Sequence, residues 1–136
     1  MGAVNHLAVI AAVLAQQALG WLWYSPLLFA GPWANAMHRT AAPLPPVSAP
    51  FLISILGSFA FCYTLAWLMQ RTGRTRVRYA LPLAAALWLG LQFFSVGTQD
   101  LFLGYGWDLI AIDSGLLLAC ALLAALILGL WRHRAA

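Results

Sequence analysis

Five polar side chains that could take part in chemistry lie inside apolar stretches of the sequence, and one of them is a carboxyl group. They are Gln17, Ser58, Gln92, Ser95 and Asp113. If each stretch is a helix with a rise of about 1.5 Å per residue, Gln17, Ser58 and Asp113 lie roughly 10 Å inside the outer ends of their helices. Gln92 falls at a similar level, with Ser95 one turn above it. The pattern therefore predicts one buried polar layer to which four helices contribute.

Asp113 is the most informative member of this layer, because an ionised carboxylate in hydrocarbon costs several kcal/mol or more. We expect it to face the other helices or a water-filled cavity, with Gln17 and Gln92 as nearby donors. One interpretation is an interhelical hydrogen-bond layer, in which each bond contributes about 0.6–2 kcal/mol. In another, the helix begins late and Asp113 charges its first turn. In a third, the carboxyl group binds and releases a proton, as a coupled transporter requires.

The two cysteines of the chain, Cys62 and Cys120, lie in separate apolar stretches. They form no Cys-x-x-Cys pair, which argues against a thiol-disulfide oxidoreductase. We interpret them as buried thiols that pack as small hydrophobic side chains.

Catalytic and metal-binding patterns are missing from the sequence. His6 and His133 are expected at one membrane face and His38 at the other, so one copy cannot assemble a three-histidine metal site. There is no Gly-x-Ser-x-Gly elbow, His-Glu-x-x-His pair or Gly-rich phosphate loop. An enzyme that acts on lipid through Asp100, Asp108 and His38 is the least favoured class. We therefore predict no catalytic residues, no metal and no cofactor.

The elements that position these side chains are expected to be membrane spans. The chain has 136 residues, of which 64% are hydrophobic and 7% are charged, whereas soluble domains are about half apolar and a quarter charged. A span needs roughly 20 apolar residues. The length accommodates four, which we place at about 7–28, 50–70, 78–99 and 108–131 within a single domain, 1–136.

The end of the first span is marked by aromatic residues and a break signal. The segment that we expect at the membrane–water interface contains Trp21, Trp23, Tyr24, Ser25, Pro26 and Trp33. Indole and phenol rings concentrate at the headgroup level because one part of each ring prefers hydrocarbon and the other water. The residue before a proline is biased away from the helical region, so the helix should end near Ser25. We expect a short interfacial helix to follow, with Trp33 and Met37 on its lipid side.

The arginines predict the orientation of the spans. With four crossings, six of them fall on the side of the two termini: Arg71, Arg74, Arg76, Arg78, Arg132 and Arg134. Only Arg39 falls on the other side. The positive-inside rule then places both termini in the cytoplasm. We interpret the run at 71–78 as a topology signal; the alternative is a site for anionic lipid or an acidic partner. Nucleic acid is not expected as a partner.

Two segments of the chain resemble a known family. They are Gly20-x-x-Trp23-Tyr24-Ser25-Pro26-Leu-Leu-Phe29, and Leu109-Ile-Ala-Ile-Asp113-Ser-Gly115 at the start of a span that closes with Leu128-Gly-Leu-Trp131. They are similar to the small bacterial membrane proteins of domain of unknown function family 1761. The family's Phe-Gly-Lys-x-Trp appears here as Phe29–Trp33 without the basic residue. The resemblance implies a four-span inner-membrane protein with no assigned chemistry.

These observations predict an all-α, four-helix transmembrane bundle with a short interfacial helix after the first span. We expect a multi-pass protein of the bacterial inner membrane, embedded in the lipid bilayer. The favoured function is a non-catalytic packing or interaction module, either as a homo-oligomer or with another membrane protein. The alternative is a proton-coupled small-molecule carrier or channel that uses Asp113. Small multidrug carriers have a similar size, but they need a carboxylate in the first span, where this chain has Gln16 and Gln17.

Overall fold

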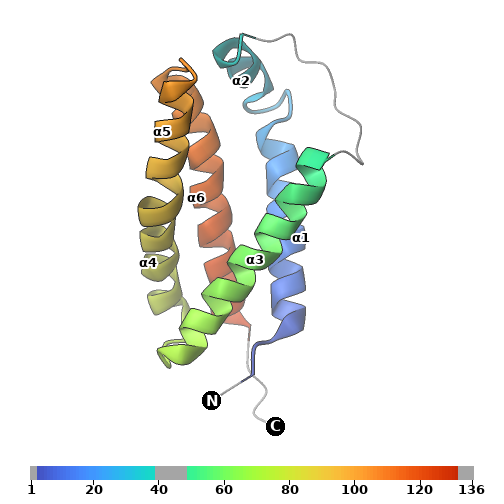
Figure 1. Ribbon diagram of the computed structural model, residues 1–136. Coiled ribbons are helices and arrows are strands. Elements are labelled where there is room, and N and C mark those ends of the chain that lie inside the picture. Colours follow the sequence, from blue (N-terminus) through green and yellow to red (C-terminus); the bar gives the residue numbers. More distant parts are fainter. Residues whose placement is uncertain (1–2, 39–48, 132–136) are drawn as a thin grey trace.

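Long helices run side by side in the computed structural model, which describes residues 3–38 and 49–131 (Figure 1). In chain order the elements are α1 (His6–Trp23), α2 (Ala30–Ala36), α3 (Ala49–Arg71), α4 (Val77–Leu87), the π-helix η1 (Trp88–Phe93), α5 (Phe94–Phe102) and α6 (Trp107–Leu130). Four helical stretches are long and apolar enough to cross a membrane, and α4, η1 and α5 together form one of them. The predicted all-α fold and the short helix between the first two spans are confirmed.

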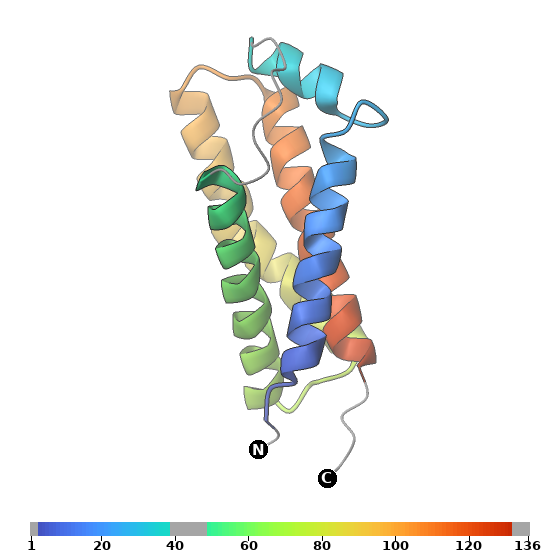
Figure 2. The same cartoon turned by 90° about the vertical axis from the view of Figure 1, so that its right-hand side faces the viewer.

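Helix α6 is the centre of the bundle and packs against both α1 and α4, while α3 packs mainly on α1 (Figure 2). Where these helices meet, many of the buried side chains are alanines: Ala8 and Ala12 on α1, Ala80 and Ala84 on α4, and Ala121, Ala124 and Ala125 on α6. Lipid tails are as apolar as leucine, so helices in a membrane gain stability from close backbone approach more than from hydrophobic burial. The alanines at four-residue spacing on the first span therefore explain its tight packing.

A close helix–helix contact is made by a glycine near the end of α6. A Cβ atom at Gly129 would lie 2.8 Å from the Cα and the backbone N of Val77, at the start of α4. Cβ atoms in proteins essentially never lie this close to another heavy atom. The two nearest atoms here belong to the backbone, so they cannot move aside as the end of a flexible side chain can. Gly129 is therefore required for α4 and α6 to approach each other at this end.

The third span is not a regular helix, because η1 inserts a π-helical segment between α4 and α5. The sequence analysis treated this span as uninterrupted. Trp88 lies at the start of η1, and its indole N–H donates to the backbone carbonyl of Ser114 on α6 (2.8 Å). Segments of this kind are rare and shift the side chains that follow to a different face of the helix.

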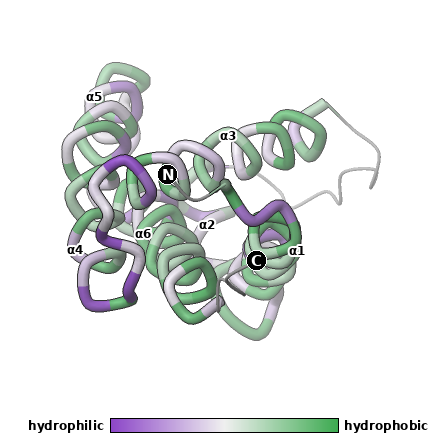
Figure 3. Tube along the Cα trace, turned by 90° about the horizontal axis from the view of Figure 1, so that it is seen from below, coloured by the Kyte–Doolittle hydropathy of each residue, from purple (hydrophilic) through white to green (hydrophobic). Residues whose placement is uncertain are grey.

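The described arginines gather at one end of the bundle. Arg71, Arg74, Arg76 and Arg78 lie in and around the turn between α3 and α4 and are all exposed. The start of α1 and the end of α6 lie at this end of the bundle, whereas α2 lies at the other (Figure 1). Figure 3 looks along the helices from the end with the termini, where the hydrophilic stretch before α4 contrasts with the apolar helices. Arg132 and Arg134 lie outside the described residues.

Candidate functional site where the first and last spans meet

The end of α1 is joined to the first half of α6 by Trp23. Its indole N–H donates to the backbone carbonyl of Ile112 (3.0 Å). The ring also lies on Gly115, where a Cβ atom would be 3.3 Å from Cζ2 of the indole. A side chain at position 115 would thus press on the ring, so glycine leaves the space that Trp23 fills.

The next residue, Tyr24, holds the carboxyl group of α6. Its hydroxyl donates to Oδ1 of Asp113 over 2.6 Å, a length typical of an O–H donor on a carboxylate. Burial, and then the hydrogen bond to Asp113, raise the pKa of the Tyr24 hydroxyl above its ordinary value, so this group remains a proton donor. The contact ties the residue that ends α1 to the second turn of α6.

Trp33 completes this group from α2. Its ring meets that of Tyr24 edge-on, with centroids 5.7 Å apart, and its side chain also interacts with the Asp113 carboxyl group. The prediction that Trp33 lies on the lipid side is therefore wrong. Backbone bonds from Phe29 to Trp23 (3.0 Å) and from Ala30 to Ser25 (3.2 Å) form a compact turn. This turn folds α2 back over the bundle.

The other members of the predicted interfacial segment contribute in different ways. Ser25 donates from its hydroxyl to the carbonyl of Leu22 (2.7 Å), which closes the last turn of α1. Pro26 is exposed. Trp21 is also exposed and stacks on Phe51 of α3, with ring centroids 6.0 Å apart. Only Trp23, Tyr24 and Trp33 point toward α6.

The five residues of the predicted polar layer are not assembled as one group. Gln17 donates from Nε2 to the Ser58 hydroxyl (2.9 Å), which links α1 to α3. Ser95 is exposed and donates to the carbonyl of Leu91 on its own helix (2.9 Å), so the prediction that it is buried in a shared layer is wrong. The reason is that η1 shifts the face on which the residues after it lie.

Gln92 belongs to η1, and its Oε1 atom is buried without a hydrogen-bond partner among the described residues. The partners observed at Asp113 are Tyr24 and Trp33 instead of the amides of Gln17 and Gln92. The polar groups of the interior thus form separate pairs between helices.

Gln16 is a buried polar residue that the sequence analysis did not place in the layer. Its side chain is 4% exposed and donates from Nε2 to the backbone carbonyl of Cys120 on α6 (3.0 Å). The thiol of Cys62 on α3 lies 3.6 Å from Gln16 Oε1. Position 16 continues the buried four-residue series of Ala8 and Ala12, which is the signal that could have identified it.

The remaining acidic residues lie near the same end of the bundle as Asp113. Asp108 accepts from the backbone N–H of Leu109 (3.0 Å) in the first turn of α6. The Oδ2 atom of Asp100 is buried and has no hydrogen-bond partner within residues 3–38 and 49–131. No group of three or more histidine, cysteine or acidic side chains in these ranges is arranged to hold a metal ion.

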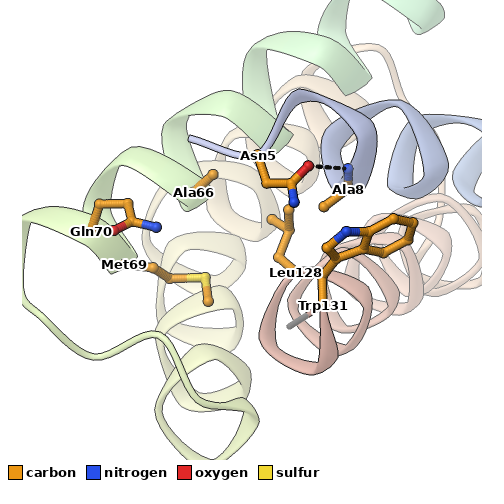
Figure 4. Close-up of a pocket in the computed structure, with 7 residues that line it drawn as sticks. All are labelled: Asn5, Ala8, Ala66, Met69, Gln70, Leu128 and Trp131. Carbon is orange, nitrogen blue, oxygen red and sulfur yellow. Dashed lines mark hydrogen bonds between the residues drawn. The ribbon is translucent and has the colours of Figure 1, made fainter. Parts of the chain in front are cut away.

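A small cavity lies at the opposite end of the bundle, between α1, α3 and α6 (Figure 4). Its volume is about 10 Å³, which is room for one water molecule at most. Asn5, Met69 and Trp131 are among its lining residues, and Asn5 caps α1 by accepting from the backbone N–H of Ala8 (3.2 Å). The cavity is too small for an organic ligand and is remote from Asp113.

The comparisons with known proteins identify one family. A family model described as a protein of unknown function (DUF1761) matches residues 7–129. No curated protein and no solved structure matches the chain. The matched residues include both segments that meet at Asp113.

Proposed function

The chain belongs to the DUF1761 family of proteins of unknown function, and from this premise we propose that it is a non-catalytic membrane module that acts through helix packing. The four candidate spans indicate a multi-pass membrane protein. The proposal places it in the bacterial inner membrane with both termini in the cytoplasm. Its partner in packing is a second copy of the same chain.

The observation that supports this proposal is the use of interior polar groups to join helices. Three interhelical pairs carry the argument: Gln17 with Ser58, Gln16 with the Cys120 carbonyl, and Tyr24 with Asp113. These groups satisfy one another across α1, α3 and α6, as expected of a bundle whose polar residues provide stability.

Helix α3 offers the surface on which a second copy would pack. It contacts mainly α1, so its other face is left to lipid. Gly57 and Ala60 are exposed on this helix, and no atom lies within 4 Å of a Cβ placed at Gly57. Small exposed residues on a helix permit close contact between helices in a membrane.

Replacement of Gly57 by leucine is expected to weaken association between copies while leaving each copy folded. No atom of the copy lies within 4 Å of a Cβ placed at Gly57, and helix propensity favours leucine over glycine by about 0.5–1 kcal/mol. Energy transfer between labelled copies in liposomes would measure the association. Gly20→Leu is the matched control, because it makes the same change on α1, also with no atom within 4 Å. Equal transfer in both variants would exclude α3 as the contact surface.

The proposed orientation can be tested with reporter fusions. A reporter inserted in the turn that contains Thr72 and Gly73 should be active only as a cytoplasmic reporter, because the four arginines of this turn resist translocation. A reporter at Gly104, between α5 and α6, should give the opposite result. The reverse pattern would contradict the orientation.

A proton-coupled carrier is the second candidate function. Two buried oxygens that have no hydrogen-bond partner among the described residues favour it: Asp100 Oδ2 and Gln92 Oε1. Buried polar atoms are normally satisfied, and exceptions often serve a function or bind water. This candidate requires Asp113 to titrate during transport.

A further inference from the structure

The turn between α3 and α4 carries an excess of positive charge at the membrane end of two spans. Four arginines fall within residues 71–78, and none of the eight residues is acidic. The three acidic residues of the chain are Asp100, Asp108 and Asp113. They lie at the end of α5 and in the first half of α6, toward the other end of the bundle. None of the acidic side chains of the chain therefore lies beside this turn.

Two of these arginines share one aromatic ring. The guanidinium carbon of Arg78 lies 4.7 Å from the centroid of the Tyr79 ring, and that of Arg74 lies 5.5 Å from the same centroid. Each contact is favourable, because the face of the ring is electronegative. Two like charges gathered at one ring nevertheless repel each other. An anion between them would convert this repulsion into attraction.

A third arginine, at the end of α3, lies over a second aromatic ring. The Arg71 guanidinium lies 5.6 Å from the ring centroid of Trp67 on α3. Tryptophan and tyrosine rings favour the headgroup level of a bilayer. The rings of Trp67 and Tyr79 therefore hold the guanidinium groups at the depth where lipid phosphates lie.

The choice of basic residue points to phosphate. All seven basic residues of the chain other than histidine are arginine, and none is lysine. A guanidinium group is planar and presents paired N–H donors that match two phosphate oxygens, whereas an ammonium group acts as a point charge. A topology signal alone requires only positive charge, which lysine supplies equally well.

We propose that Arg74, Arg78 and Tyr79, together with Arg71, form a binding site for an anionic phospholipid headgroup that carries two phosphate charges. Arg74 and Arg78, which share the Tyr79 ring, contact the phosphate oxygens, and Arg71 contacts the headgroup from α3. Cardiolipin carries two such charges, and phosphatidylglycerol carries one. The site is independent of the packing function proposed above.

Charge-conserving variants test this site, because they separate specific binding from general attraction to a charged surface. The full-length protein in neutral detergent would be titrated with cardiolipin, and bound lipid would be measured by native mass spectrometry. Tyr79→Leu and Arg78→Lys are expected to weaken binding about fivefold, since they remove the ring or the planar guanidinium without changing the net charge. Both residues are exposed, so folding should be unaffected.

Tyr79→Phe and Arg76→Lys are the matched controls. The first retains the aromatic face. The second changes an exposed arginine of the same turn for which no ring contact is observed among the described residues. Both should bind cardiolipin within about twofold of the parent. If all four variants bind as the parent does, the turn attracts lipid only through its net charge and the proposal fails.

Two further measurements show whether the site binds a lipid with two phosphate charges, a lipid with one, or a soluble phosphate compound. At equal phosphate concentration, phosphatidylglycerol should bind more weakly than cardiolipin; equal binding would contradict a site for two charges. Inorganic phosphate at millimolar concentration should not displace cardiolipin. Displacement would assign the site to a soluble phosphate compound and overturn the lipid proposal.

Discussion

Replacement of Gly129 by alanine is expected to destabilise the bundle by about 1–3 kcal/mol, the usual range for an overpacked contact. The new Cβ atom would lie 2.8 Å from the Val77 backbone N and Cα, and 2.9 Å from its Cγ2. The backbone cannot rotate away as a flexible side chain can, so the start of α4 has to move off α6. Unfolding of the purified protein in mild detergent, followed by loss of helical signal, would measure the change.

The control for this prediction is Gly20→Ala, where the sign is expected to reverse. No atom lies within 4 Å of a Cβ placed at Gly20 on α1, and alanine is favoured over glycine inside a helix by up to about 1 kcal/mol. The two substitutions are chemically identical and both lie in helices, so the difference between them reports on contact alone. If Gly129→Ala were as stable as Gly20→Ala, the close approach of α4 and α6 would be wrong.

The four-span architecture could be predicted because it follows from local composition. Long apolar stretches, bounded by arginine turns or tryptophans, have few alternatives in a membrane, where every backbone polar group must be satisfied within a helix. The short helix after α1 was predicted for a similar reason, since Pro26 marks the end of α1 and Pro32 is compatible with the first turn of a new helix. Neither argument depends on which helices are neighbours.

Features that depend on how helices meet could not be predicted in the same way. Gly129 is one of 11 glycines in the sequence, and only its position opposite Val77 distinguishes it. The η1 segment contains no proline, and its single glycine, Gly90, does not by itself predict a π-helical segment. Its effect is nevertheless large, because it turns Ser95 to the exterior and leaves Gln92 Oε1 buried without a partner among the described residues.

The candidate site could be predicted in part. The sequence analysis singled out Asp113 and the aromatic segment around Tyr24 but treated them as separate features, a buried layer and a membrane anchor. Depth along each helix was estimated well enough to place Gln17 opposite Ser58. The fold-back of α2 was not foreseen, because it depends on the turn at 24–29. An isolated interfacial helix offers Trp33 no neighbour other than lipid, so the sequence alone predicts the lipid side for this ring.

Three consecutive residues of α6 each have a distinct partner in the bundle. The side chain of Asp113 accepts from Tyr24, the carbonyl of Ser114 accepts from Trp88, and Gly115 provides the surface for the Trp23 ring. The short Asp-Ser-Gly sequence therefore connects α6 to the first and the third spans at one level. The contacts of Asp113, Ser114 and Gly115 with other helices therefore account for this sequence, and no helix N-terminus lies at Asp113.

Asp113→Asn is expected to lower the free energy of unfolding by about 1–2 kcal/mol, because a hydrogen bond to a charged acceptor becomes a bond to a neutral one. Asparagine keeps the shape and one acceptor oxygen, so the bundle should still form. Tyr24→Phe removes the donor of the same 2.6 Å bond. In the double variant the losses should not add, and the coupling between the two sites should be at least about 0.5 kcal/mol. Unfolding of all four proteins in the same detergent would give this value.

The same variants decide between the two proposed functions when they are reconstituted in liposomes with an imposed pH gradient. If Asp113 and Tyr24 form a structural contact, the parent and Asp113→Asn should leave the gradient equally intact while differing in stability. Asparagine cannot titrate. A parent that dissipates the gradient and a folded Asp113→Asn variant that does not would therefore reject the packing module, and would identify Asp113 as the proton-binding group of a carrier.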